Sequence, residues 1–438
     1  MFLTVRVPLV AAVLSIACFL VPGNAAPGVW ISLLVVNLAL VLIVLGDILL
    51  APSIKNVSVT REHPPVAITG SRIDVTWRIS TAVARSVRVG VADALPPSLQ
   101  AATRRVTTRV PRGGTAAATT VLTPTRRGRF LLDEVTVRTV GPLGLGGRQG
   151  RQRVRSTLRV HPPFRSRKDA ELRIRRARIL DIGLRSSRGL GGGTEFEQLR
   201  EYTSDDEFRN VDWAASARAG RMIVKTYRPE RNQTIIVMLD SGRLMAAQSD
   251  GVPRIEHAMD AVMALGAVAT KLGDKVGLMV FDTEVRSIVA PARNRDQVSR
   301  MTEAMFDIEP QLATSDYGRA FSEMLVRFRR RSLVVLLTEL SEQAVEDALL
   351  PALPLVARHH VVIVASVSDG EVRGWLDGSV ADPAGAYRRA AAVIASEERR
   401  RAGSRLKSRG VRVIDAPPGA LAAQLADAYL HIKTTGAL

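Results

Sequence analysis

Two long apolar runs near the start of the chain constrain its fold more than any other feature. No Lys or Arg occurs between Arg6 and Lys55, and the runs occupy about residues 7–21 and 29–50. A helix needs about 20 apolar residues to cross a bilayer, so the second run is long enough and the first is near the lower limit. The segment PGNAAPG separates them as a tight turn. We therefore expect a transmembrane helix hairpin in residues 1–53.

The charges that flank these runs predict their orientation. Basic residues lie before the first run, at Arg6, and after the second run, from Lys55 onward. The positive-inside rule then places both ends in the cytoplasm. We expect an integral protein of the cell membrane whose residues 54–438 are cytoplasmic. A cleaved signal peptide is the rival interpretation of the first run, because residues 24–26 are similar to a cleavage site.

The excess positive charge of the chain is confined to one segment. Residues 51–180 hold 26 Lys and Arg against 7 Asp and Glu, which accounts for the whole formal net charge of +19. Next to a membrane helix, such a segment favours an anionic lipid surface by about 1 kcal/mol for each basic residue near it. A compositional bias toward Arg is the alternative explanation. Aromatic residues are scarce there, so we expect no nucleic-acid partner.

The middle of the chain has the pattern of a small all-β domain. Residues 54–163 contain about seven short segments rich in β-branched residues, and turn signals such as HPP, RGG and RRG separate them. This spacing is typical of an antiparallel, immunoglobulin-like sandwich. Residues 164–233 follow as a connector whose first part is basic and has helical spacing.

The last part of the chain, residues 234–438, alternates between strands and helices. Continuous apolar runs, TIIVMLD, KVGLMVFD, RSLVVLLTEL, HVVIVASV and VRVIDAP, have the length of buried parallel strands. Segments with helical periodicity lie between them. The alternation predicts an α/β domain with a doubly wound parallel sheet. Ligands of such sheets bind beyond the carboxyl ends of the strands, where this chain places acidic and hydroxyl groups suited to Mg²⁺.

This domain resembles a von Willebrand factor type A domain. The metal site of that domain uses Asp-x-Ser-x-Ser on the first strand, a Thr on a later loop and an Asp at a further strand end. The corresponding residues here, in that order, are Asp240, Gly242, Leu244, Ser315 (or Thr314) and Glu339. The resemblance thus implies a degenerate metal site at Asp240, Ser315 and Glu339, with Mg²⁺ as the cation it would hold. No other cofactor is expected.

A second resemblance covers residues 192–240, GGTEFEQLREYTSDDEFRNVDWAASARAGRMIVKTYRPERNQTIIVMLD. The segment is similar to the signature of the bacterial family called domain of unknown function fifty-eight. The residues that match its motifs are Glu195, Phe196, Arg200, Glu201, Tyr202, Asp205, Asp206, Arg209, Asp212, Trp213, Ser216, Arg218, Glu230 and Arg231. Ser204 stands where a glycine is usual. Residues 123–145 also resemble the family, with Gly141 where an Asp is common.

The second resemblance implies a partner more than an activity. Members of this family are membrane-anchored and are commonly encoded beside MoxR-type AAA+ ATPases, which suggests an adaptor or a substrate of such an ATPase. We therefore expect a membrane-anchored interaction protein and no enzyme. Its docking residues would come from the signature: Glu195, Arg200, Glu201, Tyr202, Asp205, Asp206, Arg209, Asp212, Trp213 and Arg218.

The acidic cluster of the signature leaves two other interpretations open. Paired carboxylates at Asp205 and Asp206 could do acid–base work, and with Asp240 they could form a metal-dependent hydrolase. In the alternative, nearby arginines pair with these acids as a polar latch, which fixes conformation more than it adds stability. Phe196 and Trp213 would then pack onto the α/β domain. We favour the latch and a docking role.

Overall fold

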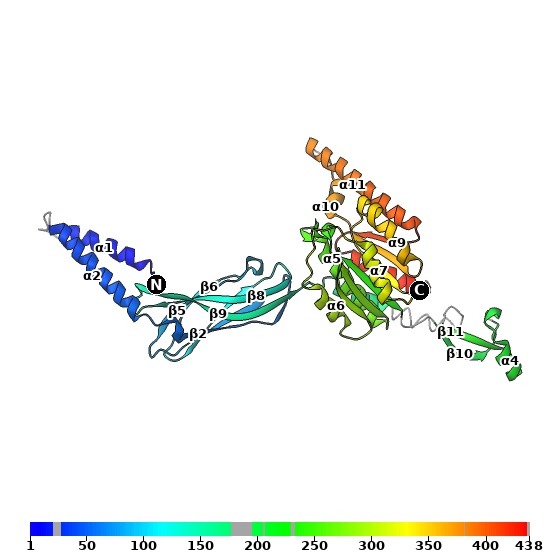
Figure 1. The fold of residues 1–438 in the computed structure, drawn as a ribbon, viewed down its shortest axis with the longest axis horizontal. Coiled ribbons are helices and arrows are strands. Elements are labelled where there is room, and N and C mark those ends of the chain that lie inside the picture. Colours follow the sequence, from blue (N-terminus) through cyan, green and yellow to red (C-terminus); the bar gives the residue numbers. More distant parts are fainter. Residues whose placement is uncertain (21–27, 177–194, 205, 229–232, 381, 436–438) are drawn as a thin grey trace. The chain divides into compact units, whose positions relative to one another are not determined.

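A computed structural model describes residues 1–20, 28–176, 195–204, 206–228, 233–380 and 382–435 (Figure 1). The chain divides into two compact units, Met1–His161 and Pro162–Leu438. Two prolines, at 162 and 163, follow the last strand of the first unit. Proline has no backbone N–H to donate, so it interrupts a strand that has neighbours on both sides, as this strand does at its end.

The two apolar runs form helices α1 (Arg6–Leu20) and α2 (Gly28–Leu50). At 1.5 Å per residue, the 23 residues of α2 reach about 34 Å, which exceeds the roughly 30 Å of hydrocarbon in a bilayer. Helix α1 has 15 residues and is shorter than that. The start of α1 packs against the end of α2, through Val7, Val10 and Ala11 on one helix and Leu40, Val44 and Ile48 on the other. The helices therefore run antiparallel, and one of them is long and apolar enough to span a membrane.

The β-rich region forms two packed sheets. One sheet has the order β1 (Phe2–Leu3), β9 (Gly146–His161), β8 (Gly128–Val140), β5 (Val87–Asp93) and β6 (Arg105–Val110), with β3 (Val66–Ile68) also beside β9. The other has the order β2 (Val57–Glu62), β4 (Ile73–Thr81) and β7 (Thr115–Leu122). Buried and exposed residues alternate along β2, because successive side chains of a strand point to opposite faces. The inward faces meet in one apolar core around Trp77.

A buried ion pair lies in this core. Both side chains, Arg61 and Asp93, are almost fully buried, and two nitrogens of the guanidinium donate to the two carboxylate oxygens at 2.6 and 2.8 Å. The third nitrogen donates to the carbonyls of Leu132 and Val154, each at 2.9 Å. The indole N–H of Trp77 donates to the same carboxylate at 2.7 Å. These hydrogen bonds satisfy the two charges and connect strands of both sheets.

Helix α2 is joined to the sandwich through Asp47, a buried acid in the last turn of the helix. Its carboxylate accepts hydrogen bonds from the backbone N–H groups of Leu143 (2.8 Å), Leu145 (2.8 Å) and Gly146 (2.9 Å), in the turn between β8 and β9. A side chain at Gly141 would overlap the Asp47 carboxylate. The absence of a side chain at position 141 therefore lets the helix approach the turn.

The second unit contains a six-stranded sheet. Its order is β16 (Val285–Ala292), β15 (Lys275–Phe281), β12 (Thr234–Asp240), β17 (Leu333–Leu337), β18 (Val361–Val367) and β19 (Arg412–Ala416). All neighbouring pairs are parallel except β15 and β16. Each of the five predicted apolar runs forms one of the parallel strands. Strand β16 was not predicted from the sequence pattern; its burial pattern is mixed because it lies at an edge of the sheet.

Helices cover both faces of this sheet. One face packs against α5 (Arg254–Lys271), α6 (Gln297–Met305) and α12 (Leu421–Thr435), and the other against α7 (Tyr317–Arg327), α9 (Leu350–Ala357) and α11 (Pro383–Ser408). Along β12, alternate residues enter the two cores. A strand buried on both faces is apolar throughout, which is why it appears in the sequence as a continuous run.

The predicted connector, residues 164–233, does not form one structural element. Its first part packs onto the α/β core, because Ala170 is buried there and the Ser166 backbone N–H donates to Asp260 at 3.1 Å. Its later part forms β10 (Glu195–Glu201) and β11 (Ile223–Arg228), which pair antiparallel, with the short helix α4 (Trp213–Ala219) between them. We call the described residues 195–204 and 206–228 the signature module.

The buried ion pair of the sandwich gives a stability prediction. Replacement of Asp93 by Ala leaves the Arg61 charge buried without a partner, so the sandwich should lose about 3–5 kcal/mol of its free energy of unfolding. Hydrogen exchange of the amides in β4, β5 and β8 would measure this in the intact chain. The exposed acid in the same sheet region, Asp74→Ala, is the matched control and should leave exchange unchanged. Equal exchange in both variants would contradict the prediction.

The contact of Asp47 with the β8–β9 turn gives a local prediction. Asp47→Leu keeps the helix apolar but leaves the N–H groups of Leu143, Leu145 and Gly146 without their acceptor. A buried donor without a partner costs about 1–3 kcal/mol, so these amides should exchange roughly 5- to 150-fold faster. Exchange measured by mass spectrometry checks this, with amides of β4 as the internal reference. Unchanged protection in the turn would show that Asp47 does not hold it.

Candidate functional site

A buried carboxyl group, that of Asp240, lies at the end of the central strand β12. One of its oxygens accepts hydrogen bonds from the Gly242 N–H at 2.8 Å and from the Ser315 hydroxyl at 2.5 Å. The other accepts from the Thr338 hydroxyl at 2.6 Å and from the Tyr317 hydroxyl at 3.1 Å. The Tyr317 and Thr338 hydroxyl oxygens are 2.9 Å apart. We call these five residues the strand-end cluster.

The order of the strands explains why these groups meet. The next strand of this sheet along the sequence, β15, lies on one side of β12, and β17 lies on the other. The connection that leaves β12 leads to α5 on one face of the sheet, and the connection that leaves β17 leads to α9 on the other face, so the two connections diverge. A crevice forms at such a point in an α/β sheet. Thr338 reaches it from the end of β17, and Ser315 and Tyr317 reach it from the start of α7.

Burial governs the acid–base properties of the strand-end cluster. Removal of Asp240 from water raises the pKa of its carboxyl group, although hydrogen bonds from Ser315, Thr338, Gly242 and Tyr317 oppose this. Burial and the nearby Asp240 carboxylate raise the pKa of the Tyr317 phenol well above its usual range. Ionisation of Asp240 and of Tyr317 is therefore harder in the cluster than in water.

The strand-end cluster does not fit a divalent cation as it stands. An ionised carboxylate has about four sites for hydrogen bonds or metal contacts, and protein donors fill four at Asp240. In the part of the chain that the structure describes, no three His, Cys, Asp or Glu residues are grouped so that they could hold a metal. A side chain at Gly242 would overlap the Ser315 hydroxyl oxygen. Ser315 thus fills the space that a serine at position 242 would need.

Glu339, the third predicted metal ligand, makes its contacts elsewhere. Its carboxylate accepts from Arg399, is 3.1 Å from an Arg254 guanidinium nitrogen, and accepts from the Ser366 hydroxyl at 3.2 Å. Burial raises the pKa of Glu339 even though Arg399 and Arg254 oppose the shift. The structure therefore brings Asp240 and Ser315 together. Thr338, the residue before Glu339, hydrogen-bonds to Asp240 at the strand end where Glu339 was expected.

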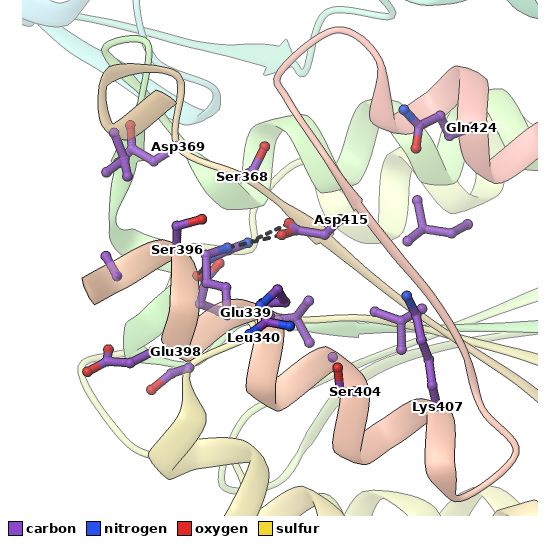
Figure 2. Close-up of a pocket in the computed structure, with 18 of the residues that line it drawn as sticks. Glu339, Leu340, Ser368, Asp369, Ser396, Glu398, Ser404, Lys407, Asp415 and Gln424 are labelled. Atoms are coloured by element: carbon purple, nitrogen blue, oxygen red, sulfur yellow. Dashed lines mark hydrogen bonds and ion pairs between the residues drawn. The ribbon is translucent and has the colours of Figure 1, made fainter. Parts of the chain in front are cut away.

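The Glu339 contacts border an open cavity of about 1020 Å³. Arg399 is central there, because it also donates to the Asp415 carboxylate at 2.6 and 3.2 Å. Figure 2 shows this ion pair, with Glu339 close to it. The cavity lies beside the ends of β17 and β18 and along β19, between α11 and α12.

In the signature module, one acid–arginine pair holds the start of a turn. Arg200, on β10, donates to both oxygens of Asp206 at 2.5 and 2.8 Å. The backbone N–H and the hydroxyl of Thr203 donate to the same carboxylate, each at 2.9 Å. Partial burial favours the neutral acid, but these hydrogen bonds from Thr203 and Arg200 lower the pKa of Asp206. Asp206 is therefore a structural anion.

A second acid of the module, Asp212, begins helix α4. Its side chain accepts from the Ala215 N–H at 3.0 Å, as an N-cap residue does, and it pairs with Lys225 on β11 at 3.1 Å. The hydrogen bond from Ala215 and the contact with Lys225 lower the pKa of Asp212. The Ser216 hydroxyl accepts from the Ile223 N–H at 2.8 Å, so α4 is fixed to β11.

Aromatic side chains are exposed on this frame. Phe208 and Trp213 are 60% and 61% exposed, and their ring centroids are 5.5 Å apart in an edge-to-face contact. Tyr202 adds a second edge-to-face contact with Phe208 at 6.4 Å. Leu199, on β10, is 45% exposed. We call Tyr202, Phe208 and Trp213 the aromatic patch.

The remaining predicted docking residues lie on the same module. Glu201, on β10, contacts Arg221 at 3.3 Å in an exposed pair. Arg209 contacts Glu207 at 2.5 Å, and Arg218 lies in the last turn of α4. Glu195 begins β10. Asp205 lies outside the described residues, as do Glu230 and Arg231.

Several contacts differ from the sequence-based expectation or are missing from it. The ring of Trp213 contacts Phe208 and is largely exposed, whereas we expected it to be buried as part of a latch. The sequence analysis did not select Thr338, Tyr317 or Lys225. Thr338 is next to Glu339 in the sequence and Tyr317 is two residues from Ser315, whereas Lys225 carries no motif that would identify it.

Comparison with known families supports the resemblance seen in the signature. Residues 198–381 match the family model described as "Protein of unknown function DUF58". The matched span contains most of the signature module and the whole strand-end cluster. Among curated proteins, no match is found.

Solved structures with a related arrangement are remote. The conserved hypothetical protein BatB from Bacteroides thetaiotaomicron is 14% identical, with a TM-score of 0.30, and the match covers 47% of this chain and 99% of that one. The CARDB domain of the PF1109 protein, in complex with di-metal ions, from Pyrococcus furiosus is 11% identical, with a TM-score of 0.18, covering 26% and 91%. Proximal thread matrix protein 1 from the mussel byssus, with a zinc-occupied MIDAS motif, is 11% identical, with a TM-score of 0.26, covering 47% and 46%. At such values these likenesses carry no argument.

The space around Gly242 predicts that the metal motif cannot be restored by one substitution. Gly242→Ser forces its side chain against Ser315 and should cost about 1–3 kcal/mol of stability, as overpacking does. It should bind no more Mg²⁺ or Mn²⁺ than the parent chain in a calorimetric titration. Gly374→Ser, at a position with open space around it, is the control. Cation binding that appears in Gly242→Ser and vanishes on a further Asp240→Ala change would refute the prediction.

The raised pKa of Asp240 predicts a pH dependence. The folded chain holds this proton more tightly than the unfolded chain, so unfolding releases it between the ordinary and the raised pKa. The free energy of unfolding should therefore fall as pH rises through that window, from about pH 4 upward. The Asp240→Asn variant lacks this pH-dependent contribution to the free energy of unfolding. It keeps the contribution of Glu339, whose pKa is also raised. The free energy of unfolding is measured against pH for the parent chain and for Asp240→Asn. A difference between the two that stays constant with pH would contradict the assignment to Asp240.

Proposed function

We propose that this protein is a membrane-anchored interaction protein whose signature module docks onto a partner through the aromatic patch. The observation that carries the proposal is the exposure of Phe208 and Trp213 on a well-fixed frame. Large apolar side chains gathered on a surface are typical of interaction sites. The few residues that carry most of the binding energy of a protein interface are enriched in Trp, Tyr and Arg.

The frame under the aromatic patch supports this role. Arg200 and Asp206 fix the turn that carries Tyr202 and Phe208, while the Asp212 cap fixes the helix that begins with Trp213. A surface held in one conformation loses less entropy when it binds. The acids of the signature thus position the aromatic side chains. The hydrogen bonds around Asp206 hold a turn and those around Asp212 cap a helix, which is a structural role and not that of a catalytic pair of acids.

The partner we propose is a MoxR-type AAA+ ATPase. This follows from the resemblance to the bacterial family of unknown function, whose model matches residues 198–381. The role proposed for the chain is that of an adaptor or substrate of the ATPase, without catalysis of its own.

We propose that helix α2 anchors the chain with residues 54–438 in the cytoplasm. Its length and composition suit a membrane span, and the basic residues after it favour the cytoplasmic side. The segment 51–180, which includes the sandwich that follows α2, carries the net positive charge of the chain. That charge would favour the anionic lipid of the same leaflet.

We further propose that the α/β domain is a doubly wound, von Willebrand factor type A-like domain with a disabled metal site. Support comes from the strand order around β12 and from the position of Asp240 at the crevice. The filled hydrogen-bond sites of Asp240 argue against a metal-dependent hydrolase there. An interaction role fits a cluster that stabilises its own loops.

A binding experiment tests the docking role. The full-length chain in detergent should retain a MoxR-type ATPase of the same organism, in at least one nucleotide state, in a pull-down. Phe208→Ala and Trp213→Ala should each weaken the interaction by about 2 kcal/mol, or roughly 30-fold. Trp375→Ala, which removes an exposed aromatic from α10 (Gly370–Asp377), is the matched control and should have no effect.

The controls distinguish docking from misfolding. Hydrogen exchange in β10 and β11 should be the same in the parent chain and in the two aromatic variants. No retention of the ATPase in any nucleotide state would refute the partnership. Retention that survives both aromatic substitutions would refute the assignment to the aromatic patch.

A further inference from the structure

Strand β19 leaves one edge of the six-stranded sheet open. Among the strands that the structure describes, β19 pairs only with β18. The carbonyl of Ala416 accepts from the Ser368 N–H at 2.8 Å, so the backbone groups of Ala416 face β18. Those of successive residues alternate between the two sides of a strand. The N–H and C=O groups of Val413 and Asp415 therefore point away from the sheet.

The cavity of about 1020 Å³ follows this open edge. Four consecutive residues of β19, Arg412 to Asp415, line it, together with residues of α11 on one wall and α12 on the other. Figure 2 shows Ser404 and Lys407 on the α11 side and Gln424 on the α12 side. The five residues of β19 extend about 16 Å at about 3.3 Å per residue. The cavity is thus a groove with the length of a short strand and an unpaired backbone along its floor.

Unpaired edges are a liability that proteins usually cover or blunt. In this groove the helices α11 and α12 flank the edge but leave it open, and the groove is lined by polar groups as well as by Val413. A segment in the extended conformation could pair with the free N–H and C=O groups of Val413 and Asp415. Recognition of peptides by addition of a strand uses this chemistry.

The charges around the groove select the kind of segment. Lys407 and Arg412 border it, and neither forms an ion pair with a carboxylate within the described residues; the Arg412 guanidinium is 3.5 Å from the His431 ring instead. The acids beside them are already engaged. Asp415 pairs with Arg399, and Asp427 pairs with Arg173 at 2.8 Å. The available charge at this end of the groove is therefore positive.

We propose that the groove along β19 binds an extended, acidic segment of a partner protein by strand addition. The backbone of Val413 and Asp415 would pair with the segment, and Lys407 and Arg412 would contact its acidic side chains. This function goes beyond the docking role of the aromatic patch. It does not depend on the identity of the ATPase, because it uses a different surface of the chain.

A peptide-binding experiment tests the proposal on the full-length chain in detergent. The probe is a fluorescein-labelled octapeptide of alternating Val and Glu, and its counterpart carries Lys in place of Glu. Fluorescence anisotropy should show saturable binding of the Glu peptide and at least about tenfold weaker binding of the Lys peptide. The positive charges of Lys407 and Arg412 attract the Glu peptide and repel the Lys peptide.

Two variants separate the backbone contribution from the charge contribution. Val413→Pro removes an outward N–H, and proline is tolerated on an edge strand at such a position. It should weaken the Glu peptide about tenfold, from the loss of a backbone hydrogen bond of about 1.5 kcal/mol. Arg412→Glu should weaken it at least as much. Arg388→Glu, on the exposed first part of α11 away from the groove, is the matched control and should bind like the parent chain.

Each remaining outcome would overturn the proposal. Failure of the parent chain to bind the Glu peptide would do so, as would equal binding of the Lys peptide. Unchanged binding by Val413→Pro, with protected β18 amides to show that the sheet is intact, would exclude strand addition. Self-association of the parent chain in sedimentation, lost in Val413→Pro, would show that a second copy of the chain occupies the edge instead of an acidic partner segment.

Discussion

The α/β unit depends on strand β12 being buried on both faces. Its side chains enter two separate apolar cores, and its two neighbours, β15 and β17, take up its backbone hydrogen bonds. Such a strand can carry polar groups only at its ends. Asp240 therefore lies where the strand leaves the core, and its four hydrogen bonds compensate for the loss of water. The loop before α7 and the end of β17 are held in place by the same carboxyl group.

Three carboxyl groups of the second unit, those of Asp240, Asp206 and Glu339, have different local environments. Asp240 is surrounded by neutral donors, so burial dominates and its pKa rises. Asp206 has an arginine and two donors from Thr203, so its pKa falls. Glu339 lies between two arginines but is buried deeply enough for its pKa to rise. Similar carboxyl groups therefore stabilise a loop, a turn and a cavity wall, respectively.

Much of the fold could be predicted from sequence because the burial of a strand on one or both faces produces a recognisable pattern of apolar residues. Strand β12 is buried on both faces, so it is a continuous apolar run in the sequence. Strand β2 is buried on one face, so buried and exposed residues alternate along it. The site was harder to predict. Thr338 and Glu339 are adjacent, so their side chains point in different directions, and sequence alone does not say which one reaches Asp240. Phe208 and Trp213 fit a buried face as well as an exposed one, because apolar character alone does not determine exposure. A single acid in an apolar run, such as Asp47, has no motif at all.

With α2 in a membrane as proposed, the Asp47 contact would set the height of the sandwich above the lipid. Its carboxylate lies in the last turn of α2 and holds three backbone N–H groups of the β8–β9 turn, with no linker between them. The depth at which the lipid holds α2 therefore fixes the depth of that turn. A bilayer a few ångströms thicker or thinner would raise or lower the whole sandwich with the helix. In a membrane, residues 1–161 would therefore move together with helix α2.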